Sequence, residues 1–152
     1  MKHLFFVLVF FISTSYAQQD FPELKWKTNL EKAQKQAKKK DKPILVYFTG
    51  SDWCSPCKQL KEDFFGTSRF NELSEKFILI EIDSPFRVDI ISEKQMAYNK
   101  KVIAKYNEEK TFPKIITLNH KGKVLGKISG YSYLRDTKNH FDFIEKQISK
   151  FY

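Results

Sequence analysis

The sequence feature that most constrains the fold is a pair of short and almost wholly apolar runs. Residues 43–48 read Pro-Ile-Leu-Val-Tyr-Phe, and residues 77–82 read Phe-Ile-Leu-Ile-Glu-Ile. A strand with one solvent-facing side alternates apolar and polar residues, whereas an unbroken run of this length is typical of a strand covered on both faces. We therefore expect an α/β fold, in which helices cover both sides of a central sheet.

The remaining periodicity fits alternating helices and strands. Helical spacing and capping residues predict five helices: from Thr28 or Asn29 to about Lys40, from the turn at 51–57 to about Phe65, over 69–76 with Ser68 as the cap, from Ser92 onward, and a C-terminal helix carrying Phe141, Ile144, Ile148 and Phe151. Two further strands, 114–118 and 124–129, flank turn residues 119–122, a pattern that favours an antiparallel hairpin.

Residues 1–17 are laid out like a secretory signal peptide. Lys2 precedes nine apolar residues, Leu4 to Ile12, and the segment ends in Ser15-Tyr16-Ala17. A small-x-Ala triplet of this kind predicts cleavage before Gln18, and the apolar run falls short of the ~20 residues that a membrane-spanning helix needs. We expect a cleaved leader, 1–17, and one domain, 18–152, located in the periplasm or secreted.

The domain is basic without showing a nucleic-acid-binding pattern. The leader holds one lysine and no acid, so the formal net charge of +9 for the whole chain falls to +8 for residues 18–152. The densest lysine run spans 32–42, where Leu30, Ala33 and Ala37 recur at helical spacing. A solvated helix face accounts for this run, and a docking patch for an acidic protein or lipid is the alternative. No interleaved aromatic residues favour base stacking, so we expect no nucleic-acid partner.

Chemistry is concentrated in the segment Trp53-Cys54-Ser55-Pro56-Cys57-Lys58. The cysteines follow an apolar run and begin a predicted helix, in which Pro56 suits an early position because no amide donor is needed there. A helix start stabilises a thiolate through its free amides and its dipole, and C-x-x-C settings favour the thiolate further. We expect Cys54 to attack disulfides, and Cys57, one turn on, to resolve the resulting mixed disulfide.

Other uses of the cysteine pair stay open at this point. Two thiolates can bind Cu(I) or Zn, but two cysteines and three histidines are too few for the usual closed zinc site, so we expect no metal. A non-catalytic interaction module with a permanently oxidised bridge is a further alternative, although so short a loop adds little stability. A Cys–His hydrolase is disfavoured, because His120 in a turn and His140 near the last helix are both expected to face solvent.

These motifs resemble the thioredoxin superfamily over nearly all of residues 18–152. The resemblance rests on Val46 to Phe48, on the C-x-x-C segment, and on Thr111 to Ile116, with Gly122 and Gly130-Tyr131 beyond; the lead-in from Phe48 to Trp53 is similar to the exported bacterial branch. It implies a thioredoxin-like three-layer α/β/α sandwich with a mixed central sheet of about four strands. It also implies that Cys54 is the nucleophile, Cys57 the resolving thiol and Pro113 a cis-proline. A shallow groove for an extended peptide would consist of Trp53, Ser55, Pro56, Phe112, Pro113, Ser129 and Gly130.

One position departs from the family pattern. Cytosolic thioredoxins carry a buried acid in the strand before the motif, which accepts a proton from the resolving thiol, and Tyr47 stands there instead. Glu62 and Asp63 are alternatives through water, but we interpret both as surface charge. The Ser-Pro pair without a histidine between the cysteines favours a reductase over an oxidase. The resemblance implies protein disulfide substrates, a membrane thiol donor, a monomer and no cofactor.

Overall fold

The computed structural model describes residues 24–152, so the expected leader and its cleavage point lie outside the described residues. The helices are α1 (Leu30–Lys40), α2 (Ser55–Leu60), the π-helix η1 (Lys61–Phe65), α3 (Ser68–Ser74), α4 (Glu93–Tyr106) and α5 (Lys138–Phe151). The strands are β1 (Ile44–Thr49), β2 (Ile78–Asp83), β3 (Lys114–Leu118) and β4 (Val124–Ser129). Within residues 24–152, no helix has the length and apolar character to cross a bilayer.

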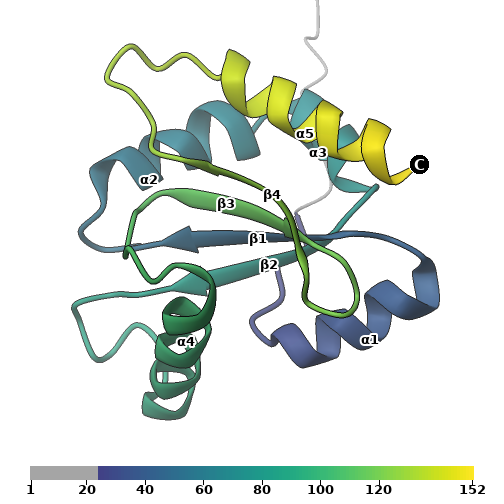
Figure 1. The fold of residues 1–152 in the computed structure, drawn as a ribbon. Helices are drawn as coiled ribbons and strands as arrows, with labels where there is room; N and C mark the ends of the chain where they lie inside the picture. The colour runs from purple at the N-terminus through teal and green to yellow at the C-terminus, as the bar shows by residue number, and fades with distance from the viewer. Residues whose placement is uncertain (1–23) are drawn as a thin grey trace, which may run out of the picture.

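The four strands form one mixed sheet in the order β2-β1-β3-β4 (Figure 1). β1 runs parallel to β2 and antiparallel to β3, and β3 and β4 form the predicted antiparallel hairpin. The outer edge of β2 is met by the arm before α1, where Lys27 forms a bridge with Ile80. The two apolar runs that dominate the sequence are therefore neighbours in the sheet.

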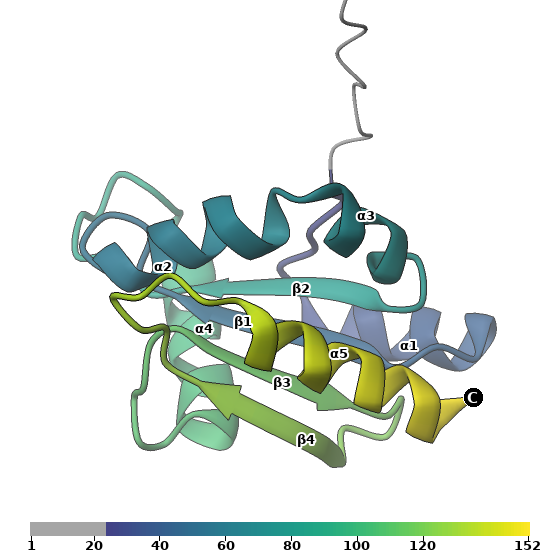
Figure 2. The same cartoon turned by 90° about the horizontal axis from the view of Figure 1, so that it is seen from above.

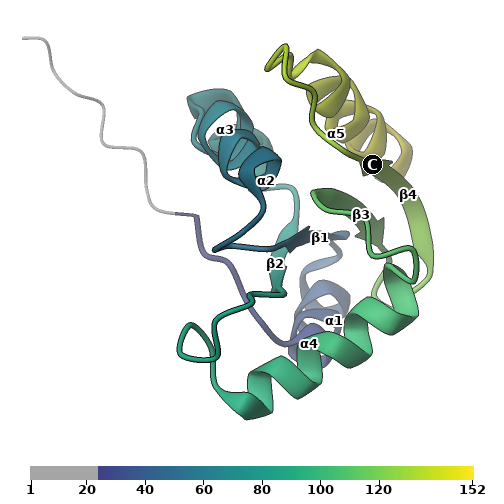
Figure 3. The ribbon, with the colours of Figure 1, turned by 90° about the vertical axis from the view of Figure 1, so that its left-hand side faces the viewer.

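Helices cover both faces of this sheet, as Figures 2 and 3 show, with α1 and α4 on one side and α2, α3 and α5 on the other. Successive side chains of β1 point to opposite faces of the sheet, so this strand contributes to the hydrophobic cluster on each side. Val46 and Phe48 pack in the cluster with α1 and α4, whereas Leu45 and Tyr47 pack in the cluster with the other helices. The protein has the expected thioredoxin-like three-layer α/β/α sandwich.

The predicted elements are confirmed, with two local differences. Thr67 caps α3 in place of the expected Ser68, because Thr67 has the extended backbone of a cap and its hydroxyl accepts the Phe70 amide. The helix expected to run on to Phe65 widens into the π-helix η1, which buries the consecutive residues Phe64 and Phe65 together. On α1 only Leu30, Ala33 and Ala37 are buried. The lysine run therefore lies on its solvent side, as the helix-face interpretation predicts.

Candidate active site

Cys54 and Cys57 are joined by a disulfide at the first turn of α2, directly beyond the carboxyl end of β1. The S–S distance is 2.08 Å and the Cα atoms lie 5.2 Å apart. Cys54 is the cap residue of α2, and its Sγ accepts a hydrogen bond from the Cys57 amide at 3.3 Å. An amide that points at this sulfur also stabilises negative charge on it, and the helix dipole acts in the same direction.

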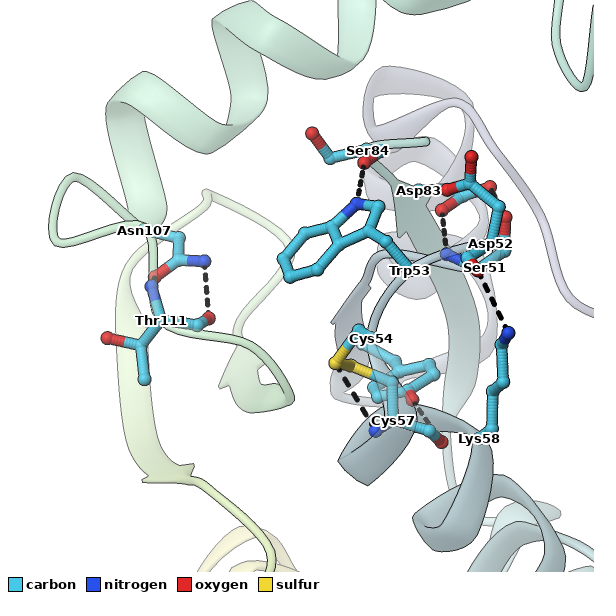
Figure 4. Close-up of a disulfide and its surroundings, with 11 residues drawn as sticks. Ser51, Asp52, Trp53, Cys54, Cys57, Lys58, Asp83, Ser84, Asn107 and Thr111 are labelled. Atoms are coloured by element: carbon cyan, nitrogen blue, oxygen red, sulfur yellow. Dashed lines mark hydrogen bonds between the residues drawn. A yellow bond between two sulfur atoms is a disulfide. The ribbon is translucent and has the colours of Figure 1, made fainter. Parts of the chain in front are cut away.

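The three residues before Cys54 are tied to β2 and to the loop that follows it (Figure 4). Asp83 accepts hydrogen bonds from the amide and the hydroxyl of Ser51, at 2.8 and 2.6 Å. The indole Nε1 of Trp53 donates to the Ser84 carbonyl at 2.8 Å. These bonds fix the conformation of the segment that precedes the disulfide, and they hold the Trp53 indole beside the sulfurs.

Asp52 has a structural use that the sequence did not reveal. Its carboxylate accepts the backbone amides of Phe86 and Arg87 at 2.9–3.1 Å, while Lys58 Nζ donates to the Asp52 carbonyl at 2.9 Å. Partial burial acts to raise the pKa of Asp52, but the bonds from Arg87 and Phe86 outweigh it and hold the pKa below its usual range. The carboxylate therefore organises the β2–α4 loop.

That loop places Phe86 against the active site. Its ring stacks on Trp53 with 4.9 Å between centroids and 14° between planes, although Phe86 is 75% exposed. An exposed stacked pair of this kind extends the apolar wall beside the disulfide. Phe86 was missed in the sequence because a single aromatic residue in a loop carries no periodic signal.

On the opposite side lies the loop that carries Phe112 and Pro113, whose peptide bond is cis, as the resemblance implied. Buried Asn107 clamps this loop, since its side-chain amide donates to the Thr111 carbonyl at 2.8 Å and its oxygen accepts the Thr111 amide at 3.1 Å (Figure 4). The Gly130 amide donates to the Pro113 carbonyl at 2.8 Å. The end of β4 is thereby attached to the cis-proline.

The predicted groove residues occupy three neighbouring segments. Trp53 and Phe112 are in ring contact, and Pro113 is bonded to Gly130. Ser55 and Pro56 form the start of α2, where Ser55 is exposed, and Ser129 is exposed at the end of β4 opposite Lys114. A buried Lys114 ammonium, paired with Glu109 at 2.8 Å, further holds the start of β3.

Beneath the disulfide, Tyr47 occupies the place of the missing acid. Its hydroxyl donates to the Cys57 carbonyl at 3.0 Å, and burial raises its pKa well above the ordinary value. Tyr47 therefore stays neutral and braces the first turn of α2. Its direct partner in the sheet is Glu81 on β2.

A family model described as a thioredoxin-like domain matches residues 30–144. The chain belongs to the thioredoxin-like family. It is similar to the disulfide bond reductase DsbH of Chlamydia pneumoniae, with 28% identity over 122 residues, which cover 76% of this chain and 72% of that relative. It is also similar to the thioredoxin-related protein DsbJ of the same organism, with 26% identity over 118 residues, 74% of this chain and 32% of DsbJ. Among solved structures, a DsbH oxidoreductase has a similar fold, with a TM-score of 0.70 at 23% identity over 84% of this chain and 86% of that one.

This membership, together with the dithiol at the helix start, identifies the thioredoxin-like protein as a thiol–disulfide oxidoreductase. Its disulfide is the oxidised form of the reacting pair. Among residues 24–152, no three His, Cys, Asp or Glu side chains gather in a way that would hold a metal ion.

One expectation about a histidine is wrong. His140 is not solvent-facing: it is 5% exposed, between the rings of Phe64 and Tyr131, because α5 begins earlier than its apolar repeat suggests. His120 is half-buried in the hairpin turn. Asp63 is a surface charge as expected, and it also accepts hydrogen bonds from the Tyr131 hydroxyl and the Arg135 guanidinium, both at 2.7 Å. That network ties the segment after β4 to η1.

Proposed function

We propose that this thioredoxin-like protein is an exported reductase of polypeptide disulfides, with Cys54 as the attacking sulfur and Cys57 as the resolving sulfur. The observation that carries the proposal is the position of the pair: Cys54 caps α2 beside the cis-proline loop. The name of the relative DsbH, a disulfide bond reductase, supports reduction. The leader-like segment 1–17 supports export to the periplasm or beyond.

The reaction proceeds in two exchanges. The Cys54 thiolate forms a bond to one sulfur of the substrate disulfide, and the other substrate sulfur leaves with the electron pair of the broken bond. The Cys57 thiolate then bonds to Cys54 Sγ and displaces the first substrate sulfur. The substrate gains two electrons and two protons, and the protein is left with the Cys54–Cys57 disulfide of the present structure.

We assign the substrate to the groove between the disulfide and the cis-proline loop. Trp53 and Phe112 supply its apolar walls, Pro113 and Gly130 its floor, and Ser55, Pro56 and Ser129 its rim. Phe86, stacked on Trp53, extends the wall. An extended chain with apolar residues near its cystine fits such a surface, since exposed aromatic rings favour apolar contacts.

Turnover requires a dithiol donor that returns two electrons and two protons to the Cys54–Cys57 disulfide. Outside the cytoplasm a membrane thiol donor suits this role, and the same groove would receive it after the substrate has left. We propose that the protein acts as a monomer.

Insulin reduction by residues 18–152 tests this function. Cys54→Ser should abolish reduction, and Cys57→Ser should accumulate a mixed disulfide with substrate, visible on a non-reducing gel. Circular dichroism should show both variants folded. Undiminished reduction by the Cys54→Ser variant would overturn the assignment.

A glutathione titration tests the direction of electron flow. A potential near that of a thioredoxin, ~−270 mV, fits a reductase, whereas one near ~−120 mV fits an oxidase. Stoichiometric Cu(I) uptake without turnover would instead favour the metal-binding alternative. A bridge that neither turns over nor traps substrate would favour an interaction module.

A further inference from the structure

Resolution of the mixed disulfide requires Cys57 to lose a proton inside the protein. Cys57 is 1% exposed, and a thiol among apolar groups ionises less readily than one in water. Tyr47, the ionisable side chain of β1, is no acceptor, because it donates to the Cys57 carbonyl and burial favours its neutral form. An acceptor must therefore come from another element.

Glu81 on β2 is placed for this task. It is the direct parallel partner of Tyr47, so the two side chains stand next to each other on the face of the sheet that α2 covers. Lys61 Nζ lies 3.7 Å from Glu81 Oε2. Lys61 follows Cys57 by four residues and its amide donates to the Cys57 carbonyl, so the two share one side of the helix. The Lys61 ion pair thus ties the Glu81 carboxylate to the helical segment that carries Cys57.

Glu81 also has access to solvent. Together with Asp83 it lines a surface cavity of about 230 Å³ at the β2 edge, whose other walls are formed by Trp26, Thr28, Ile91, Gln95 and Asn99. A cavity of this size holds several waters. A proton that reaches Glu81 from the Cys57 side can therefore leave to bulk water from the other side.

From this arrangement we propose that Glu81 accepts the proton of Cys57 through an intervening water and releases it to solvent in the β2-edge cavity. The inference rests on the proposed function, in which Cys57 is the resolving thiol. In this step the Cys57 S–H bond breaks and its proton passes to the carboxylate. The electron pair left on Cys57 forms the bond to Cys54 Sγ, and the substrate sulfur leaves with the electrons of the broken disulfide.

The charges around Glu81 suit an acceptor. Burial raises the pKa of Glu81, Lys61 from η1 opposes this rise, and Asp83 from β2 adds to it. Tyr47 faces it from β1, while the cavity residues from α4, Gln95 and Asn99, are neutral. A carboxylate of raised basicity accepts a proton more readily near neutral pH. Asp83 is the poorer candidate, since both of its oxygens already bind Ser51.

Two successive releases of thionitrobenzoate from the aromatic disulfide DTNB separate the two exchanges. The reduced protein liberates the first equivalent when Cys54 attacks and the second when Cys57 resolves the adduct. We expect Glu81→Gln to slow the second release about 10–100-fold at pH 7 and to leave the first within twofold. The deficit should shrink as the pH rises towards about pH 9, because hydroxide can then take the Cys57 proton in place of Glu81. Glu81→Asp should recover part of the rate.

Glu62→Gln is the matched control. Glu62 is an exposed acid on η1, next to the Lys61 that pairs with Glu81, and it is itself paired with Arg135. It should leave both releases unchanged. An unaltered second release in Glu81→Gln across the pH range would overturn the role of Glu81, and so would a deficit of equal size at every pH, which indicates misplacement of Cys57. A parent protein that shows no first release would instead overturn the proposed function itself.

Discussion

The rings of Phe112 and Trp53 meet edge to face, with 5.5 Å between centroids and 80° between planes. The same side chain is half-buried and packs against both core clusters, one of which contains the two cysteines. Cys54 itself is only 3% exposed. We infer that Phe112 limits access to the disulfide, in addition to its proposed place in the groove wall.

From this contact we expect Phe112→Ala to change the rates with small and with large reactants in opposite directions. Dithiothreitol should reduce the exposed disulfide several-fold faster, while insulin reduction should slow several-fold because an apolar wall is lost. We expect a loss of about 1–3 kcal/mol in the free energy of unfolding, less than for a fully buried Phe. Stopped-flow fluorescence and urea unfolding measure these effects. A disulfide that dithiothreitol reduces no faster would show that Phe112 does not shield it.

Because Phe86 is exposed beside Trp53, we expect its removal to weaken substrate binding without slowing disulfide exchange itself. Phe86→Ala should raise the KM for insulin several-fold, because the apolar surface beside Trp53 shrinks, and should leave the rate with DTNB unchanged. Val88→Ala is the control, since Val88 is 83% exposed in the same loop. Equal KM values for these two variants would remove Phe86 from the groove.

The clamp of Asn107 on Thr111 predicts a positioning effect on the cis-proline loop. Asn107→Ala leaves the amide and the carbonyl of Thr111 without these bonds, so we expect a loss of about 1–3 kcal/mol in unfolding free energy and slower insulin reduction. Asn107→Asp keeps the acceptor and loses the donor, and should fall between the parent and the alanine variant. Urea titration of the oxidised proteins measures the unfolding free energies of the parent and the two variants. Parent-like stability in the alanine variant would contradict it.

Buried His140 predicts a pH-dependent stability. Burial lowers its pKa below the ordinary value of 6.5, against a backbone hydrogen bond with Gly130 and the charge of Asp136. Below about pH 6.5, His140 binds a proton in the unfolded chain but stays unprotonated in the folded protein until the pH falls to its lowered pKa. The stabilisation is therefore complete above that pH and is lost as pH falls through the folded pKa, at about 1.4 kcal/mol per pH unit.

Urea midpoints between about pH 5 and 7.5 test this prediction. The parent should lose stability towards acid more steeply than His140→Phe, which fills the space between Phe64 and Tyr131 without titrating. A His140→Phe slope that equals the parent slope would contradict the prediction.

The strands and helices could be predicted because each leaves a periodic or capping signal. The apolar runs gave β1 and β2, Asn29 and Ser92 cap α1 and α4 as expected, and the spacing of Phe141 and Ile144 gave α5. The cysteine pair and the proline loop were equally visible, because their residue types and order are specific.

What the sequence could not show are contacts between segments far apart in the chain. Asp52 reads as a charge beside Trp53, yet it binds amides more than thirty residues away. Glu81 interrupts an apolar run without revealing that Tyr47 and Lys61 flank it. His140 looked exposed because its burial depends on Tyr131 and on the exact start of α5. Such groups are placed by tertiary packing, which local patterns do not encode.

The bridge between Lys27 and Ile80 has a consequence for self-association. A free strand edge invites another chain to extend the sheet, and β2 is the more apolar of the two outer strands. The Lys27 amide donates to the Leu79 carbonyl and the Lys27 carbonyl accepts the Glu81 amide. This segment therefore already occupies the edge and discourages intermolecular β-pairing along the more apolar outer strand.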